Sequence, residues 1–335
     1  MISRQSKILI TGGTGSLGKK LTARILEKFP DIERLVIFSR DEQKQFRMQQ
    51  DYPKEKYPNM RFFIGDVRDK ERLIRAMEGI DIVIHTAAMK HVHLAEYNPM
   101  EAVKTNIMGA QNVIDAAFAN NIKHVVALST DKAAAPINLY GATKLTSDKL
   151  FIAANNIKGK RDIKFSVVRY GNVMGSNGSV IPFFYHQRKK GFLPITDKRM
   201  TRFNISLDEG ADMVFLALEK AWGGEIFVPK IPSYLITDLA HAICPECELK
   251  EIGIRPGEKL HEEMITSSDS FYTYDHGDYF TILPSQPVFD LNRFIKETGA
   301  EKVPDGFSYN SKDNKPYLSV ETLRRLIREN LHLDV

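Results

Sequence analysis

Cysteine is scarce in this chain. Cys244 and Cys247 are the only two among 335 residues, and two cysteines cannot form the disulfide framework of a small secreted protein. We therefore expect a reduced protein of the cytoplasm. Their spacing, Cys-Pro-Glu-Cys, is typical of half a zinc site, but no second Cys or His pair stands at matching spacing, so we expect no bound metal.

Long apolar runs and a strong charge of one sign are also missing. No segment approaches the roughly 18 consecutive apolar residues needed to cross a bilayer, and the apolar run before Thr11 is far shorter than a signal-peptide core. The 47 basic and 42 acidic residues leave a net charge of +5, which suits anionic ligands but is too small and too evenly spread to indicate nucleic acid. We expect no export, no membrane anchor and no nucleic-acid partner.

What the chain does contain is an alternation of apolar strands with helical segments. Near-continuous apolar strands predict a parallel sheet that is covered on both faces, so we expect an α/β fold with a doubly wound, Rossmann-type sheet. The expected strands are 7–11, 34–40, 61–67, 80–88, 124–130 and 164–173. The expected helices are 17–29, 41–50, 70–77 with Asp69 as N-cap, 102–120 and 140–155.

The pattern loosens after Gly175, where prolines recur. We expect residues 1–173 to form a nucleotide-binding domain to which 205–230 return. Residues 174–204 and 231–335 would form a smaller, interleaved substrate-binding lobe that ends in an amphipathic helix over 320–331.

A glycine-rich loop follows the first strand directly. Gly12, Gly15 and Gly18 give the spacing G-x-x-G-x-x-G and lead into a helix. Glycine is needed where the backbone turns tightly, approaches a pyrophosphate and packs a helix on a strand, and the helix N-terminus then faces the phosphates. The loop predicts a dinucleotide site, whose contacts we assign to residues 11, 12 and 15–18 (Thr11, Gly12, Gly15, Ser16, Leu17 and Gly18).

The end of the second strand bears on the choice of dinucleotide. An acidic residue there would bind a ribose 2′-hydroxyl, whereas this strand ends in Ser39-Arg40, which suits a 2′-phosphate and favours NADP over NAD. The alternative is that Arg40 is a solvated charge and Asp41 binds the ribose. Asp66 and Val67, at the end of the third strand, are expected to border the adenine, although Asp66 could instead cap a helix.

A Tyr-x-x-x-Lys pair follows the fifth strand. Tyr140 and Lys144 are four residues apart and therefore lie on one face of the predicted helix. An ammonium beside a phenol, near a positively charged nicotinamide, stabilises the phenolate and lowers the pKa of the phenol from about 10. Such a tyrosine can take a proton from a sugar hydroxyl while hydride passes to a nicotinamide.

Together these motifs resemble the extended short-chain dehydrogenases/reductases over nearly the whole chain. Within that superfamily the chain resembles the inverting UDP-N-acetylglucosamine 4,6-dehydratases, which open the pseudaminic acid pathway. The motifs that carry this resemblance are STDKAAAPINLYGATK (129–144), VVRYGNVMGSNGSVIPFF (167–184), MTRF (200–203), GGEIFVPKIPS (223–233) and RPGEKLHEEM (255–264).

The resemblance implies a lyase reaction on UDP-N-acetylglucosamine with tightly bound, recycled NADP. The sugar is oxidised at carbon 4, water is lost across carbons 5 and 6, and hydride returns to carbon 6 while carbon 5 is inverted. Asp131, next to Thr130, would be the acid and Lys132 the base at carbon 5. As a base near neutrality, Lys132 needs its pKa to fall from about 10.4 by about 2–3 pH units, which burial and the Lys144 charge could supply.

The resemblance also assigns binding residues, both within these motifs and outside them. Ala87, Ala88, Lys90 and Asn106 join Tyr140 and Lys144 around the cofactor; Lys90, Asn172, Ser179, Val180, Arg202, Arg255 and Glu258 are expected around the UDP-sugar. Asn204 stands where the family pattern leads us to expect a bulky aromatic residue. A homo-oligomer, with a hexamer as one form, and a role in flagellin or other surface glycosylation are likewise implied.

Three alternatives stay open. A nucleotide-sugar 4-epimerase would need Tyr140 and Lys144 but not the Asp131-Lys132 pair. A retaining 4,6-dehydratase would differ in the configuration at carbon 5. A non-catalytic protein that senses NADP would keep the fold without turnover.

Overall fold

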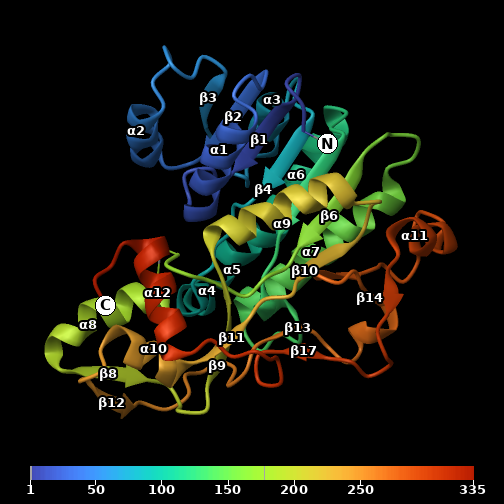
Figure 1. Cartoon of the computed structure of the whole chain (residues 1–335). Helices are drawn as coiled ribbons and strands as arrows, with labels where there is room; N and C mark the ends of the chain where they lie inside the picture. The colour runs from blue at the N-terminus through green and yellow to red at the C-terminus, as the bar shows by residue number, and fades with distance from the viewer. Residues whose placement is uncertain (1, 177) are drawn as a thin grey trace.

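A ten-stranded sheet forms the centre of the molecule (Figure 1). The computed structural model describes residues 2–176 and 178–335. Parallel strands run across the sheet in the order β3 (Met60–Ile64), β2 (Arg34–Ser39), β1 (Lys7–Thr11), β4 (Ile82–His85), β5 (His124–Leu128), β6 (Lys164–Val168) and β10 (Ile226–Pro229). This order confirms the expected doubly wound, Rossmann-type fold.

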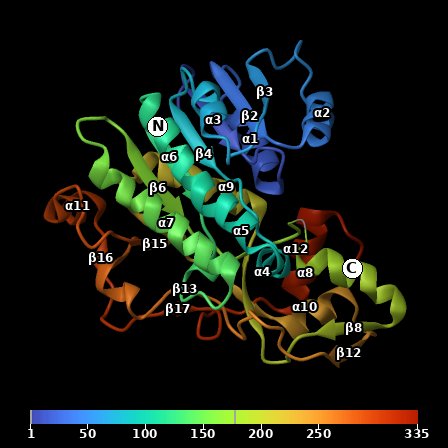
Figure 2. The same cartoon turned by 180° about the vertical axis from the view of Figure 1, so that it is seen from behind.

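Helices cover both faces of the sheet, as Figures 1 and 2 show from opposite sides. One face carries α1 (Ser16–Lys28) packed against α9 (Leu207–Lys220), and the other carries α3 (Lys70–Ala76), α6 (Gly109–Ala119) and α7 (Leu139–Ile157). The central strands β1, β4 and β5 are mostly apolar because both of their faces are buried, whereas the edge strand β3 is partly exposed. Helix α2 (Glu42–Asp51) lies beside β3 at the sheet edge.

The local signals for helix boundaries act as expected. The Asp69 side chain accepts a hydrogen bond from the Arg72 amide and caps α3, which confirms the assigned N-cap. The segment expected as one helix over 102–120 is instead divided into α5 (Pro99–Ala102), a π-helical turn η1 (Val103–Met108) and α6, and α4 (Val92–Tyr97) precedes them. Such π turns are frequent at functional sites.

The strand expected over 164–173 is interrupted. β6 ends at Val168, and β7 (Asn172–Val173) pairs with β9 (Thr201–Ile205) instead of the main sheet. The backbone between them, at Gly171, packs closely on Phe203: a Cβ there would lie 2.5 Å from the Phe203 Cβ. The chain therefore leaves the main sheet at this point and enters a second layer.

A smaller lobe has its own apolar core. It is built from α8 (Val180–Gln187), β8 (Phe192–Ile195), α10 (Ile236–Ile243), β12 (Glu248–Glu251) and α12 (Val320–Leu331), with β9 flanked by β11 (Ser233–Leu235) and β7. The short β13 (Glu263–Ile265) pairs with β17 (Tyr309–Asn310) below the main sheet. We propose this lobe as the substrate-binding part of the molecule.

Two features depart from the sequence analysis. Residues of the C-terminal region return to the main sheet, where β15 (Tyr279–Ile282), β14 (Thr273–Asp275) and β16 (Glu301–Lys302) extend it beyond β10, with α11 (Leu291–Thr298) alongside. Cys244 and Cys247, expected to be reduced, form a disulfide at the end of α10. The two cysteines adjoin across a single turn, with Cα atoms 5.4 Å apart.

No helix in residues 2–176 and 178–335 is long and apolar enough to cross a membrane. The same residues contain no cluster of His, Cys, Asp and Glu side chains that could hold a metal ion.

Candidate active site

A cleft of about 780 Å³ opens at the carboxyl ends of the parallel strands. Ligands of doubly wound sheets bind at this edge. Among its lining residues are most of those assigned from the sequence: Gly12, Gly15, Ser16, Leu17, Gly18, Ser39, Arg40, Asp66, Val67, Ala87, Ala88, Lys90, Thr130, Asp131, Lys132, Tyr140, Lys144, Asn172 and Ser179.

The glycine-rich loop leaves no room for side chains. Gly12 has φ +66°, and a Cβ there would lie 2.8 Å from the Ala87 amide nitrogen. A Cβ on Gly18 would lie 2.6 Å from Gly13. Because the loop is bare and α1 begins directly after Gly15, the first amides of the helix are open to an anion in the cleft. This cradle fits a pyrophosphate.

The end of β2 presents hydroxyl groups and a cation. The Thr14 and Ser39 hydroxyls are 2.8 Å apart, and the Arg40 side chain is 67% exposed, with Nη1 3.8 Å from Asp66. Asp41, which also lines the cleft, caps α2 by accepting the Lys44 amide on Oδ1. The alternative in which Asp41 binds the ribose therefore stays open.

Asn106 holds the loop after β4 in place. Its side-chain amide pairs with both the amide and the carbonyl of Met89, at 2.8 and 2.9 Å, and also donates to the Thr143 hydroxyl at 3.0 Å. The π turn in which it lies aims this side chain away from the cleft. Asn106 therefore holds the cleft-lining loop after β4 against α7.

Helix α7 carries the Tyr140 and Lys144 pair. Asn138 begins the helix by accepting the Gly141 amide at 2.7 Å, and both side chains of the pair are buried at the cleft wall. Burial raises the pKa of Tyr140 to about 12, although the Lys132 charge and the Thr130 hydroxyl oppose the rise. In the protein alone, desolvation exceeds the effect of these neighbouring groups, and a lowered pKa beside a nicotinamide charge stays a prediction.

Lys144 is buried as well. Burial lowers its pKa, and the Asp148 carboxylate one turn further along α7 opposes the change. Asp148 accepts the Ser129 hydroxyl at 2.6 Å and an Arg169 guanidinium nitrogen at 3.3 Å. Sequence reasoning missed this buried network, although the spacing of four from Lys144 to Asp148 could have indicated it.

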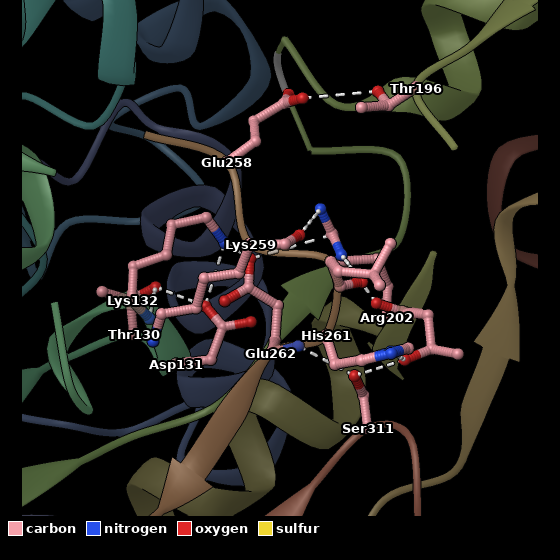
Figure 3. Close-up of polar contacts among 12 residues, drawn as sticks. Thr130, Asp131, Lys132, Thr196, Arg202, Glu258, Lys259, His261, Glu262 and Ser311 are labelled. Carbon is pink, nitrogen blue, oxygen red and sulfur yellow. Dashed lines mark hydrogen bonds and ion pairs between the residues drawn. The ribbon is translucent and has the colours of Figure 1, made fainter. Parts of the chain in front are cut away.

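Asp131 and Lys132 lie in a single 3₁₀ turn, η2 (Asp131–Ala133), directly after β5. Lys132 Nζ is 3.0 Å from Asp131 Oδ1 and 3.3 Å from Glu262 Oε1 (Figure 3). Arg202 completes the group, with Nε 3.8 Å from the same Glu262 oxygen. We call these four residues the acid–base cluster.

The surroundings of the cluster shift the pKa values of Asp131 and Lys132. Burial raises the pKa of Asp131, which favours a protonated carboxyl group. For Lys132, burial alone would lower the pKa, but the Asp131 and Glu262 carboxylates outweigh it and raise the pKa above its usual value. The expectation that burial and Lys144 would lower this pKa is wrong, because it counted neither the adjacent Asp131 carboxylate nor Glu262, which lies 130 positions away in the chain.

Six of the assigned residues do not line the cleft: Thr11, Asn106, Val180, Arg202, Arg255 and Glu258. The buried Thr11 hydroxyl is hydrogen-bonded to His85 Nδ1, with the two atoms 2.8 Å apart. Arg202, expected at the substrate, is buried and donates to the carbonyls of Thr201, Lys259 and Leu260. Its guanidinium therefore anchors the segment before β13.

Arg255 and Glu258 lie on that same segment, further from the acid–base cluster. Their charged groups are 3.9 Å apart, and Glu258 accepts the Thr196 hydroxyl at 3.3 Å, as Figure 3 shows. Arg255 is 59% exposed. Their role at a diphosphate and ribose stays a prediction.

Further lining residues were missed by the sequence analysis: Thr14, Lys44, Thr86, Met89, His91, Ser129, Tyr170, Ser176 and Leu207. Apart from Lys44 in α2 and Leu207 at the start of α9, they belong to loops whose positions follow only from the packing of the elements around them. The signal for Lys44 was present, because it lies one helical turn past Arg40 on a polar helix.

The fold and the glycine-lined cleft are those of the extended short-chain dehydrogenases/reductases. Residues 8–284 match the family model described as polysaccharide biosynthesis protein. The chain is 57% identical to the UDP-N-acetylglucosamine 4,6-dehydratase (inverting) of Campylobacter jejuni subsp. jejuni serotype O:2, over 96% of this chain and 97% of that one. It therefore belongs to this polysaccharide biosynthesis family.

One further relative and two solved structures are also similar to this chain. The UDP-glucose 4-epimerase of Rickettsia canadensis is 40% identical over 96% of this chain and 94% of its own. The X-ray structure of Pen from Bacillus thuringiensis superposes with a TM-score of 0.89 at 40% identity, covering 99% and 100% of the two chains. DesIV, a dTDP-glucose 4,6-dehydratase from Streptomyces venezuelae with NAD and TYD bound, shares the fold at 21% identity and a TM-score of 0.69, over 97% and 98%.

Proposed function

We propose that the protein is an inverting UDP-N-acetylglucosamine 4,6-dehydratase. The observation that carries the proposal is the placement of the Asp131-Lys132 pair beside Tyr140 at one cleft wall. A 4-epimerase needs the tyrosine and a nicotinamide but no acid and base for loss of water. The 57% identity to the Campylobacter jejuni enzyme supports the same reading.

We propose NADP as the nicotinamide dinucleotide. The bare glycine cradle suits its pyrophosphate, and the Ser39 and Thr14 hydroxyls with the exposed guanidinium of Arg40 suit a 2′-phosphate. When bound, the dinucleotide supplies a hydride acceptor and donor and a positive charge that favours the Tyr140 phenolate. A cofactor regenerated within each cycle stays bound.

In this proposal Tyr140 takes the proton of the sugar 4-hydroxyl as carbon 4 is oxidised. Lys144, buried behind it, supports the phenolate through its charge. The new ketone makes the proton on carbon 5 acidic. The reaction can then pass to the neighbouring η2 turn without release of the sugar.

Loss of water uses Asp131 and Lys132. Asp131 protonates the leaving 6-hydroxyl, a role that fits a carboxyl whose pKa is raised by burial. Lys132 takes the carbon-5 proton. Within the described residues, Asp131 Oδ2, Asn172 Oδ1 and the Ser179 hydroxyl are buried without a hydrogen-bond partner, so each is available to a ligand.

Incubation with UDP-N-acetylglucosamine and no added cofactor tests the proposal. A product lighter by the mass of one water molecule is expected. An unchanged mass with a new sugar signal would instead identify an epimerase, and no turnover would point to a protein that only senses the dinucleotide.

The context of the reaction is also a proposal. We place the enzyme in the cytoplasm, at the first step of pseudaminic acid synthesis for flagellin or another surface glycan, and as a homo-oligomer. The family resemblance supports each of these assignments.

A further inference from the structure

Glu262 is a buried carboxylate that the proposed reaction does not use. Its side chain is 3% exposed, and it lies immediately before β13. Within the described residues its Oε2 atom has no hydrogen-bond partner. Burial of a carboxylate lowers the stability of a protein unless the charge is paired. The ion pair with Lys132 therefore points to a function for Glu262.

The segment that carries Glu262 is hydrogen-bonded to the residues that follow the η2 turn. Lys259 Nζ donates to the Ala134 carbonyl at 2.6 Å, and Asn138 Nδ2 donates to the Gly257 carbonyl at 2.8 Å. Arg202 holds the carbonyls of residues 259 and 260 from the other side, at 3.0 and 3.1 Å (Figure 3). The Glu262 carboxylate is therefore held at a fixed distance from Lys132.

We infer that Glu262 is a positioning residue for the elimination: it holds the Lys132 amine beside Asp131 and controls when that amine can take the carbon-5 proton. This inference rests on the proposed dehydratase function. The same segment carries Arg255 and Glu258, which we assign to the nucleotide. The Lys132–Glu262 ion pair thus links the nucleotide-binding segment to the acid and base.

The sign of the effect follows from the charges around Lys132. Both nearby carboxylates favour the ammonium form, Arg202 opposes it, and burial opposes it as well. Lys132 acts as a base only after it has lost its proton. Other charged or titratable groups facing the cluster are Tyr140 from α7, Tyr234 from β11, Lys259, and His261 on the Arg202 side.

The test is the pH dependence of carbon-5 exchange in heavy water by Glu262→Gln. Removal of one carboxylate favours the neutral amine, so the acidic limb of the exchange profile is expected to move to lower pH by about 1 pH unit or more. Glu263→Gln is the matched control, since its side chain is half-buried in β13 and outside the cluster. Its profile is expected to overlay that of the unaltered protein.

A second variant, with a more conservative change, keeps the inference testable if Glu262→Gln does not fold. Glu262→Asp keeps the charge but shortens its reach to Lys132, so a smaller shift in the same direction is expected. Coincident profiles for the unaltered protein and both Glu262 variants, or shifts to higher pH, would overturn the inference. The unaltered protein is first assayed for elimination of water from UDP-N-acetylglucosamine. No elimination there would count against the proposed function, whereas unshifted profiles in an active protein would count only against the role of Glu262.

Discussion

The closest backbone approach in the site predicts a large effect of adding one methyl group. Gly141 is the third residue of α7, and a Cβ at this position would lie 2.1 Å from the Lys132 carbonyl oxygen and 3.0 Å from its carbonyl carbon. Ordinary contact begins near 3.4 Å. The Gly141→Ala variant must therefore separate the η2 turn from the start of α7 by more than 1 Å.

Two consequences can be given magnitudes. Overpacking a buried site costs about 1–3 kcal/mol of the free energy of unfolding, partly offset by the roughly 1 kcal/mol gained when alanine replaces glycine in a helix. A displacement of about 1 Å between catalytic groups lowers the rate by about 100-fold. We expect Gly141→Ala to lose at least that factor in water loss, although the folded state persists.

The matched control is Gly210→Ala in α9. A Cβ there would meet its nearest neighbour at 3.7 Å, an ordinary contact, and its backbone is helical. Urea denaturation gives the stability of each variant, and mass spectrometry gives the rate of water loss. Equal rates for the two variants would refute the claim that the Lys132 carbonyl sets the spacing between the η2 turn and Tyr140.

Two further substitutions test the cofactor site and its support. Arg40→Ala is expected to weaken NADP binding about 10- to 100-fold in calorimetry, because it removes hydrogen bonds to a charged group, and to leave NAD binding unchanged. The control variant Arg47→Ala, at an exposed residue, is expected to bind both dinucleotides as the unaltered protein does. Equal losses for both dinucleotides in Arg40→Ala would count against a 2′-phosphate site. Asn106→Ala is expected to lower the free energy of unfolding by about 2–4 kcal/mol, since buried Met89 and Thr143 groups lose their partner. A change no larger than that of Asn112→Ala, whose two bonds are near the surface, would show that the loop has other support.

Local patterns predicted the central part of the molecule. Strand β1, the glycine loop and α1 follow from adjacent residues, and the four-residue spacing of Tyr140 and Lys144 fixes their common face. The Asp69 cap is equally local. These features need no information from distant parts of the chain.

What the sequence could not supply was contact between distant segments. Glu262 and Lys132 are 130 positions apart, and no periodicity relates them. Together with the adjacent Asp131 carboxylate, Glu262 shifts the pKa of Lys132 in the opposite direction from the one expected. The break after β6 depends on Phe203 packing against Gly171, and the return of residues 273–302 to the sheet depends on pairing with β10.

The account depends most on Lys132 as the base. We expect Lys132→Met to retain the first oxidation, seen as the near-ultraviolet absorbance of the reduced dinucleotide after UDP-N-acetylglucosamine is added. In heavy water the recovered sugar should carry no deuterium at carbon 5, whereas the unaltered protein incorporates it. Undiminished exchange at carbon 5 in the variant would contradict the assignment of Lys132.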